Sequence, residues 1–76
     1  MIKVLFFASF RDRIGRDEDT IEASEVLTVA EVWARVAAGR PMPTNTLAAV
    51  NLDYASLDRE VHDGDEVAFF PPVTGG

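Results

Sequence analysis

Short apolar runs separated by polar turns along the chain predict several strands. Residues 2–8 (IKVLFFA) are mostly β-branched or aromatic, have the length of a strand and include one polar side chain, Lys3. Successive side chains of a strand point to opposite faces, and both faces of this strand are largely apolar. The segment is therefore predicted to be a central strand, or a strand with one face kept for a partner.

The clearest helix signal lies at residues 28–38. Thr28 and Glu31 have the T-x-x-E spacing of a capping box, in which each side chain bonds a free backbone N–H group. Apolar residues then recur at the spacing of one buried helical face: Val29, Val32, Trp33, Val36 and Ala37. Gly39 is expected at the C-cap, and Pro41 blocks any continuation of the helix.

The remaining elements are strands separated by polar turns. In chain order they are a helical turn at 9–14 ended by Gly15, an acidic turn at 17–19, a strand at 20–23, a loop at 42–46, a strand at 47–50, a turn at 51–53, short mixed structure at 54–61, a turn at 63–65 and a strand at 66–70. The first two strands can pair as a hairpin. This order predicts an α+β fold, with a sheet covered on one face by one main helix.

Composition limits the possible functions. The chain has 76 residues, enough for one domain, and contains no cysteine and one histidine. Disulfides, a cysteine nucleophile and multi-histidine metal sites are therefore excluded. The net charge of −6 disfavours nucleic acid and anionic membrane surfaces as partners and favours a basic protein. No apolar run is long enough to span a bilayer, so we expect a cytoplasmic protein.

Charge is unevenly distributed along the chain. Residues 1–16 carry +3, residues 17–38 carry −5 and residues 39–66 carry −4, whereas residues 67–76 have no charged side chain. Side-chain catalysis is not predicted, because the single His62 is most simply a surface loop residue. Asp63 and Asp65 flank a turn but are too few for a calcium loop, so no metal site is expected.

The C-terminal segment, residues 69–76 (FFPPVTGG), is the most informative part of the chain. Pro71 and Pro72 stiffen it, and it finishes on two glycines, which lack a Cβ atom and can enter a narrow tunnel. From Pro72 to Gly76 the extended reach is roughly 16 Å. A frayed terminus is the simplest alternative. The pattern favours presentation of a C-terminal carboxylate inside the active site of another protein.

These residues carry a resemblance to a known family. Residues 63–76 (DGDEVAFFPPVTGG) are similar to the C-terminus of the small, sulfur-carrier subunits of molybdopterin synthase, and residues 1–8 and 47–51 also resemble that family. The resemblance implies a ubiquitin-like β-grasp fold, a mixed sheet of four to five strands with one main helix. It implies a β-grasp domain at 1–72 and a flexible Gly-Gly tail at 73–76. The connection at 39–46 is short for the family.

The resemblance also implies a carrier function. An E1-like adenylyltransferase would use ATP to activate the Gly76 carboxylate, and a persulfide donor would convert it to a thiocarboxylate. The tail, with Val73, Thr74 and Gly75 threaded through a tunnel, would enter the large subunit of molybdopterin synthase, in a heterotetramer, and donate sulfur to cyclic pyranopterin monophosphate. Catalytic residues are expected on the large subunit. No cofactor would be bound permanently.

In the β-grasp fold the first and last strands are neighbours, so strand parity predicts two faces. Eight residues are expected to pack beneath the helix: Val4, Phe6, Val29, Val32, Trp33, Val36, Val67 and Phe69. Leu5, Phe7 and Phe70 are then expected to form a partner-binding patch on the open face, bordered by Tyr54. Pro71 and Pro72 would fix where the tail leaves this patch.

Three other functions fit the same fold. The first is the related sulfur carrier of thiamine thiazole synthesis, whose tail lacks the Phe-Phe-Pro-Pro-Val element. The second is a ubiquitin-like modifier that forms isopeptide bonds with lysines. The third is a β-grasp binding module whose terminal glycines have no function.

Overall fold

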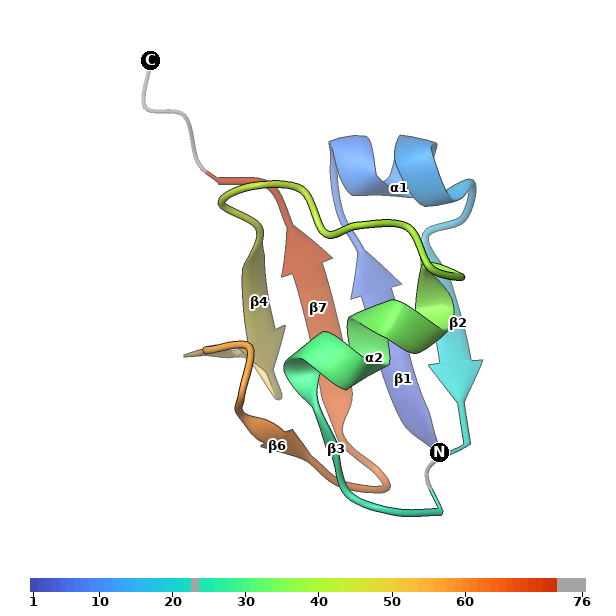
Figure 1. Ribbon diagram of the computed structural model, residues 1–76, viewed down its shortest axis with the longest axis vertical. Helices are drawn as coiled ribbons and strands as arrows, with labels where there is room; N and C mark the ends of the chain where they lie inside the picture. The colour runs from blue at the N-terminus through green and yellow to red at the C-terminus, as the bar shows by residue number, and fades with distance from the viewer. Residues whose placement is uncertain (23, 73–76) are drawn as a thin grey trace.

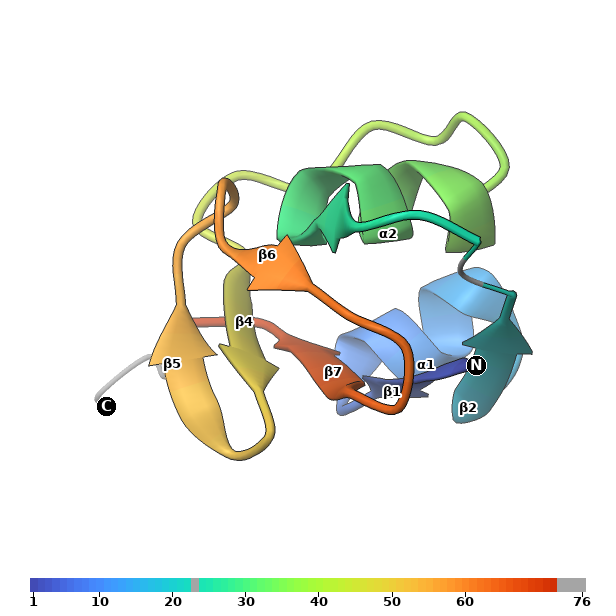
Figure 2. The ribbon, with the colours of Figure 1, turned by 90° about the horizontal axis from the view of Figure 1, so that it is seen from below.

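A mixed five-stranded sheet, with strand order β2-β1-β7-β4-β5, is crossed on one face by helix α2 in the computed structural model (Figures 1 and 2). The structure describes residues 1–22 and 24–72. Its elements are β1 (Ile2–Phe6), α1 (Ser9–Ile14), β2 (Glu18–Ile21), β3 (Leu27–Thr28), α2 (Val29–Val36), β4 (Leu47–Val50), β5 (Asp53–Ala55), β6 (Glu60–Val61) and β7 (Glu66–Phe70). The predicted α+β class and the number of strands in the main sheet are confirmed.

The first and last strands form the centre of the sheet. β1 and β7 are parallel, with Val4 opposite Val67 and Phe6 opposite Phe69. β2 and β4 pair antiparallel to the outer sides of β1 and β7, and β5 pairs with β4 at the edge. Since residues directly opposite in a sheet share a face, this register collects the apolar side chains of both central strands beneath α2.

Helix α2 covers this face, and its start is the predicted capping box. The Thr28 hydroxyl accepts a hydrogen bond from the Glu31 N–H, and the Glu31 carboxylate accepts one from the Thr28 N–H. All eight predicted core residues are buried in one cluster. Trp33 is central to it, with its ring edge-on to Phe69 at a centroid distance of 5.1 Å. Further core residues come from other elements: Ile2, Phe10, Leu27, Ala37, Ala48, Val50 and Val61.

Two predicted strand boundaries are wrong. The first strand ends at Phe6 rather than Ala8, because Ala8 has a φ of 54° and turns the chain into α1. The second strand begins at Glu18, within the segment predicted as an acidic turn. Pairing with β1 outweighs the low strand propensity of acidic residues. The Lys3 Nζ atom also lies 3.6 Å from the Glu18 Oε2 atom across the hairpin. Ala23, the predicted end of this strand, lies outside the described residues.

The helix also ends earlier than predicted. Its C-cap is Ala37 rather than Gly39, and Ala38 and Gly39 follow with φ values of 52° and 85°. Arg16 donates a hydrogen bond of 3.0 Å to the Val36 carbonyl, which satisfies one of the free acceptors at this helix end. The short β3–β6 ladder was not predicted, because two residues per strand leave no recognisable period.

Phe69→Ala is expected to lower the free energy of unfolding by about 3–5 kcal/mol, because the ring is fully buried against Phe6 and Trp33. Phe6→Ala should cost a similar amount. This approaches the total stability of a small domain, so Phe69→Leu, expected to cost about 1 kcal/mol, provides a folded comparison. Chemical denaturation measures all three.

Phe7→Ala is the matched control, since this ring is 49% exposed. A loss for Phe7→Ala as large as that for Phe69→Ala would contradict the assignment of the two faces.

Candidate functional site

The open face of the sheet carries an apolar hollow of about 240 Å³. Its lining comes from the strands and from the hairpin that joins β4 to β5: Phe7, Ala49, Leu52, Tyr54, Ala68 and Phe70. The ring centroids of Tyr54 and Phe70 lie 5.8 Å apart. We call these six residues the open-face patch. An exposed apolar surface with aromatic side chains is typical of an interaction site.

Strand pairing explains how these residues meet. Phe70 is the last residue of β7, and Phe7 directly follows β1, where its N–H donates to the Phe69 carbonyl. Tyr54 projects from the edge strand β5 and is 73% exposed. Leu5 is half-buried opposite Ala68 and so shares their face, although it does not line the hollow. The structure therefore brings Phe7, Tyr54 and Phe70 together.

Three patch residues are missing from the predicted patch, Ala49, Leu52 and Ala68, and Leu52 is the most exposed of them. It lies in the two-residue turn between β4 and β5, where Asn51 and Leu52 have φ values of 51° and 74°. A left-handed backbone costs a side-chain-bearing residue roughly 1–2 kcal/mol, and glycine is the usual choice in such turns. Leu52 is nevertheless 90% exposed and lines the hollow. Because strained backbone clusters at functional sites, the exposed Leu52 side chain belongs to the candidate interaction surface.

The predicted tail residues Val73, Thr74, Gly75 and Gly76 lie outside the described residues. The structure describes the two residues before them, half-buried Pro71 and exposed Pro72, which follow Phe70 at the end of β7 (Figure 1). The chain therefore leaves the sheet directly beside the open-face patch.

The polar residues of the last turn are engaged in the fold. Asp65 accepts hydrogen bonds from the His62 N–H at 2.8 Å and the Asn51 amide at 3.0 Å. The His62 hydrogen bond, then that of Asn51, lowers the pKa of the Asp65 carboxyl below its usual value. Asp63 pairs with the N-terminal amine. Within residues 1–22 and 24–72, no three histidine, aspartate or glutamate side chains form a metal-binding cluster.

Neither helix in the described part of the chain is long and apolar enough to cross a membrane.

Comparisons with known proteins agree with this geometry. The model of the ThiS family matches residues 4–76. The molybdopterin synthase sulfur carrier subunit of Escherichia coli is 45% identical, and the alignment covers all of both chains. The H. volcanii small archaeal modifier protein 1 has a TM-score of 0.81 at 19% identity, with 95% of this chain and 97% of that chain covered.

A third neighbour comes from an assembly. It belongs to the protein–protein complex of subunits 1 and 2 of the molybdopterin-converting factor of Helicobacter pylori. The TM-score is 0.65 at 25% identity, and the match covers 99% of this chain and 97% of that one. Together, these neighbours confirm the ubiquitin-like β-grasp fold.

Asp65→Ala is expected to destabilise the fold by about 1–2 kcal/mol at neutral pH, because two hydrogen bonds to a charged acceptor are lost. The pKa of Asp65 is lower in the folded chain than in the unfolded one. The greater stability of the unmodified chain is therefore fully present above the pKa of the unfolded chain, about 4, and is lost as the pH falls through the pKa of the folded chain. Denaturation at several pH values measures the difference.

Asp53→Asn, at an exposed aspartate of β5, is the control for the loss of one negative charge. A stability difference between Asp65→Ala and the unmodified chain that stays constant down to strongly acidic pH would contradict this role of the Asp65 carboxylate.

Proposed function

Because this chain belongs to the ThiS family, we propose that it is a sulfur carrier that acts with molybdopterin synthase. The observation that carries the proposal is the 45% identity to the E. coli sulfur carrier subunit over the whole of both chains. The open-face patch beside the start of the tail supports it, since a carrier must dock while its terminus enters a partner.

The proposed chemistry takes place at the Gly76 carboxylate. A carboxylate is a poor electrophile, so an E1-like adenylyltransferase would join it to AMP, with pyrophosphate as the leaving group. The terminal sulfur of a donor persulfide would then attack the carbonyl carbon and displace AMP. A thiol would cleave the S–S bond of the resulting acyl persulfide, which leaves the Gly76 thiocarboxylate and a disulfide.

The second half of the cycle would take place in the large subunit. The tail, residues 73–76, would enter its active site, where catalytic residues of the large subunit transfer sulfur to cyclic pyranopterin monophosphate. The neighbour from the H. pylori complex of subunits 1 and 2 supports such a partner. This chain would contribute the carried sulfur and the docking surface. ATP would be used by the activating enzyme, so no resident cofactor is required.

The open-face patch would be the surface that the large subunit binds. Phe7, Leu5, Tyr54 and Phe70 would provide apolar contacts, and Pro71 and Pro72 would direct the tail. From Pro72 to Gly76 an extended chain would reach roughly 16 Å, which suits an active site recessed within the partner.

One experiment distinguishes the related functions. The chain is incubated with ATP, an activating enzyme and a sulfur source, and its intact mass is measured. A gain equal to the exchange of one oxygen for one sulfur identifies a carrier, and subsequent conversion of the pterin identifies the pathway. Thiazole formation instead would identify the thiamine carrier. A covalent product that joins this chain to a second protein would identify a modifier. An unchanged mass would favour the binding module.

Deletion of Gly76, or addition of one residue after it, should abolish sulfur transfer while leaving the fold intact. The reacting carbon must reach a fixed position, and a displacement of about 1 Å can lower a rate about a hundredfold. Gly75→Ala should also slow transfer, because it adds a Cβ atom within the tunnel. Pterin conversion at the normal rate by the deletion variant would refute the carrier function.

Phe70→Ala should weaken binding to the large subunit by about 2 kcal/mol, or roughly thirtyfold, while lowering folding stability much less. Its ring is half-buried at the surface and packs against exposed Tyr54, outside the core. Titration measures the binding, and chemical denaturation measures the stability. Val26→Ala, an exposed apolar side chain outside the patch, is the matched control.

A second variant tests the same patch with the opposite effect on folding. Leu52→Gly relieves the left-handed strain, so it should raise the free energy of unfolding by about 1 kcal/mol and still weaken binding. Unchanged binding by both patch variants would show that the large subunit docks elsewhere.

A further inference from the structure

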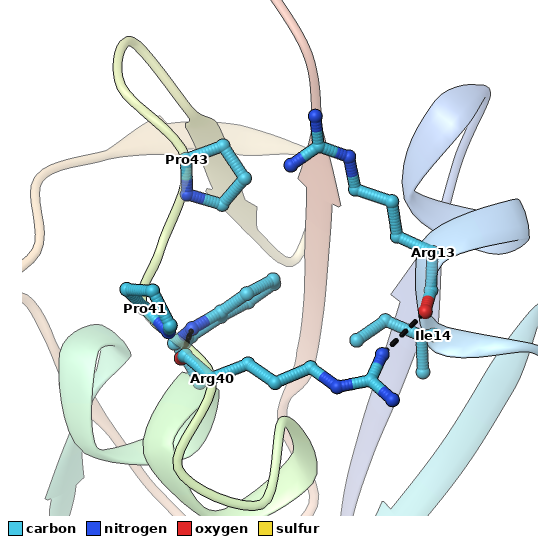
Figure 3. Close-up of a pocket in the computed structure, with 6 residues that line it drawn as sticks. Arg13, Ile14, Arg40, Pro41 and Pro43 are labelled. Atoms are coloured by element: carbon cyan, nitrogen blue, oxygen red, sulfur yellow. Dashed lines mark hydrogen bonds between the residues drawn. The ribbon is translucent and has the colours of Figure 1, made fainter.

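A second hollow, of about 310 Å³, lies at the helix-covered side of the molecule, between α1, the end of α2 and the segment that follows it (Figure 3). Its lining is apolar except for two arginines: Arg13, Ile14, Trp33, Arg40, Pro41 and Pro43. Figure 3 shows the two arginine side chains on either side of the opening, with the prolines along one edge and Ile14 opposite. We call these six residues the arginine pocket.

Hydrogen bonds fix the shape of the arginine pocket. The Trp33 indole N–H donates to the main-chain carbonyl of Arg40 at 3.0 Å. The Arg40 guanidinium in turn donates to the main-chain carbonyl of Arg13, as the dashed line in Figure 3 shows. The indole is thus tied to the segment that carries Arg40, and Arg40 is tied to α1. A pocket held in this way needs little reorganisation to accept a ligand.

The arginine pocket is a positive site on an acidic chain. Lys3 pairs with Glu18, and Arg16 pairs with Asp19. In the part of the chain that the structure describes, none of the ion pairs involves Arg13 or Arg40. Exposed Asp12 is the acidic residue of α1. The Arg13 guanidinium, and the N–H groups of the Arg40 guanidinium that do not contact the Arg13 carbonyl, are therefore available to pair with a carboxylate from outside.

The floor of the arginine pocket selects apolar groups. The indole N–H and the Arg40 carbonyl satisfy one another, and among the described residues no buried side-chain polar atom lacks a hydrogen-bond partner. A heterocyclic metabolite would leave its ring nitrogens unpaired there, at a cost in affinity. An aliphatic or aromatic side chain has no polar group there and would lose no hydrogen bond. The volume lies at the small end of the range for ligand sites, which suits a single side chain.

We propose that the arginine pocket binds an acidic peptide segment of a partner protein. An apolar side chain of the segment enters between Pro41, Pro43 and Trp33, and flanking carboxylates pair with Arg13 and Arg40. Location favours a protein as the occupant, because α1 and the connection from α2 to β4 lie at the same end of the molecule as the last residues of β7 (Figure 1). This site is separate from the open-face patch and does not depend on sulfur transfer.

The test uses Trp33, the single tryptophan of the chain, as the reporter. The ¹⁵N-labelled full chain is titrated with acetyl-Glu-Leu-Glu-amide, and the indole N–H resonance is followed by NMR. We expect a saturable shift. The affinity should fall about tenfold for acetyl-Gln-Leu-Gln-amide, which lacks the charges, and for acetyl-Glu-Gly-Glu-amide, which lacks the side chain. Added salt should weaken binding of the acidic peptide.

Matched variants locate the site. Arg13→Gln combined with Arg40→Gln should weaken binding of the acidic peptide about tenfold. The hydrogen bond from the Trp33 indole N–H to the Arg40 main-chain carbonyl is retained, whereas that from the Arg40 guanidinium to the Arg13 carbonyl is lost. Arg11→Gln combined with Arg35→Gln makes the same change in net charge outside the pocket and should leave the affinity unchanged. A Trp33 indole N–H resonance at the position seen in the unmodified chain reports that a variant is folded.

Several results would overturn the proposal. They are an indole resonance that does not move, equal affinities for the three peptides, or equal losses in the two double variants. Free 4-methylpentanoate carries the leucine side chain and one carboxylate without a peptide. If it bound as tightly as acetyl-Glu-Leu-Glu-amide, the pocket would be a site for a small carboxylic acid rather than a peptide.

Discussion

The parallel pairing of β1 with β7 is the constraint on which the rest of the structure depends. Its register places Phe6 beside Phe69 under α2, and it brings Phe7 and Phe70 to the opposite face. A shift of one residue would turn Phe69 outward and Phe70 into the core. One set of backbone hydrogen bonds therefore determines the buried cluster and the exposed patch together, and it fixes where the C-terminal segment leaves the sheet.

Local signals in the sequence were sufficient for the elements that are stabilised locally. The capping box and apolar spacing of α2 involve residues three or four apart, and strand parity in β7 predicted which rings face solvent. Contacts between distant residues were not predictable in this way. Glu18 belongs to a strand because of its pairing with β1, and β3 exists because Leu27 meets Val61. The sequence predicts the turn at 51–53, but which face of the sheet Leu52 joins depends on the long-range pairing of β4 with β7.

Charge shows the same division between local pattern and tertiary structure. The sequence places an excess of positive charge at residues 1–16, but folding pairs Lys3 and Arg16 with carboxylates of β2. The guanidinium of Arg40, in the segment that follows α2, instead donates a hydrogen bond to the main-chain carbonyl of Arg13. Two guanidinium groups therefore lie at one hollow of a chain whose net charge is −6, and they would attract an acidic segment there. No spacing rule links positions 13 and 40.

A carrier must be released as well as bound, and the two hollows suit this requirement. Each offers a few apolar side chains, so each alone would contribute modest affinity, and a small interface dissociates quickly. Two separate contacts on one rigid domain combine through their high effective concentration, provided that both fit the same partner. A partner that binds the open-face patch and the arginine pocket together would dissociate slowly, whereas a partner that binds only one of them would dissociate quickly. Under the proposed function, the chain could in this way pass from its activating enzyme to the large subunit with no change in its own fold.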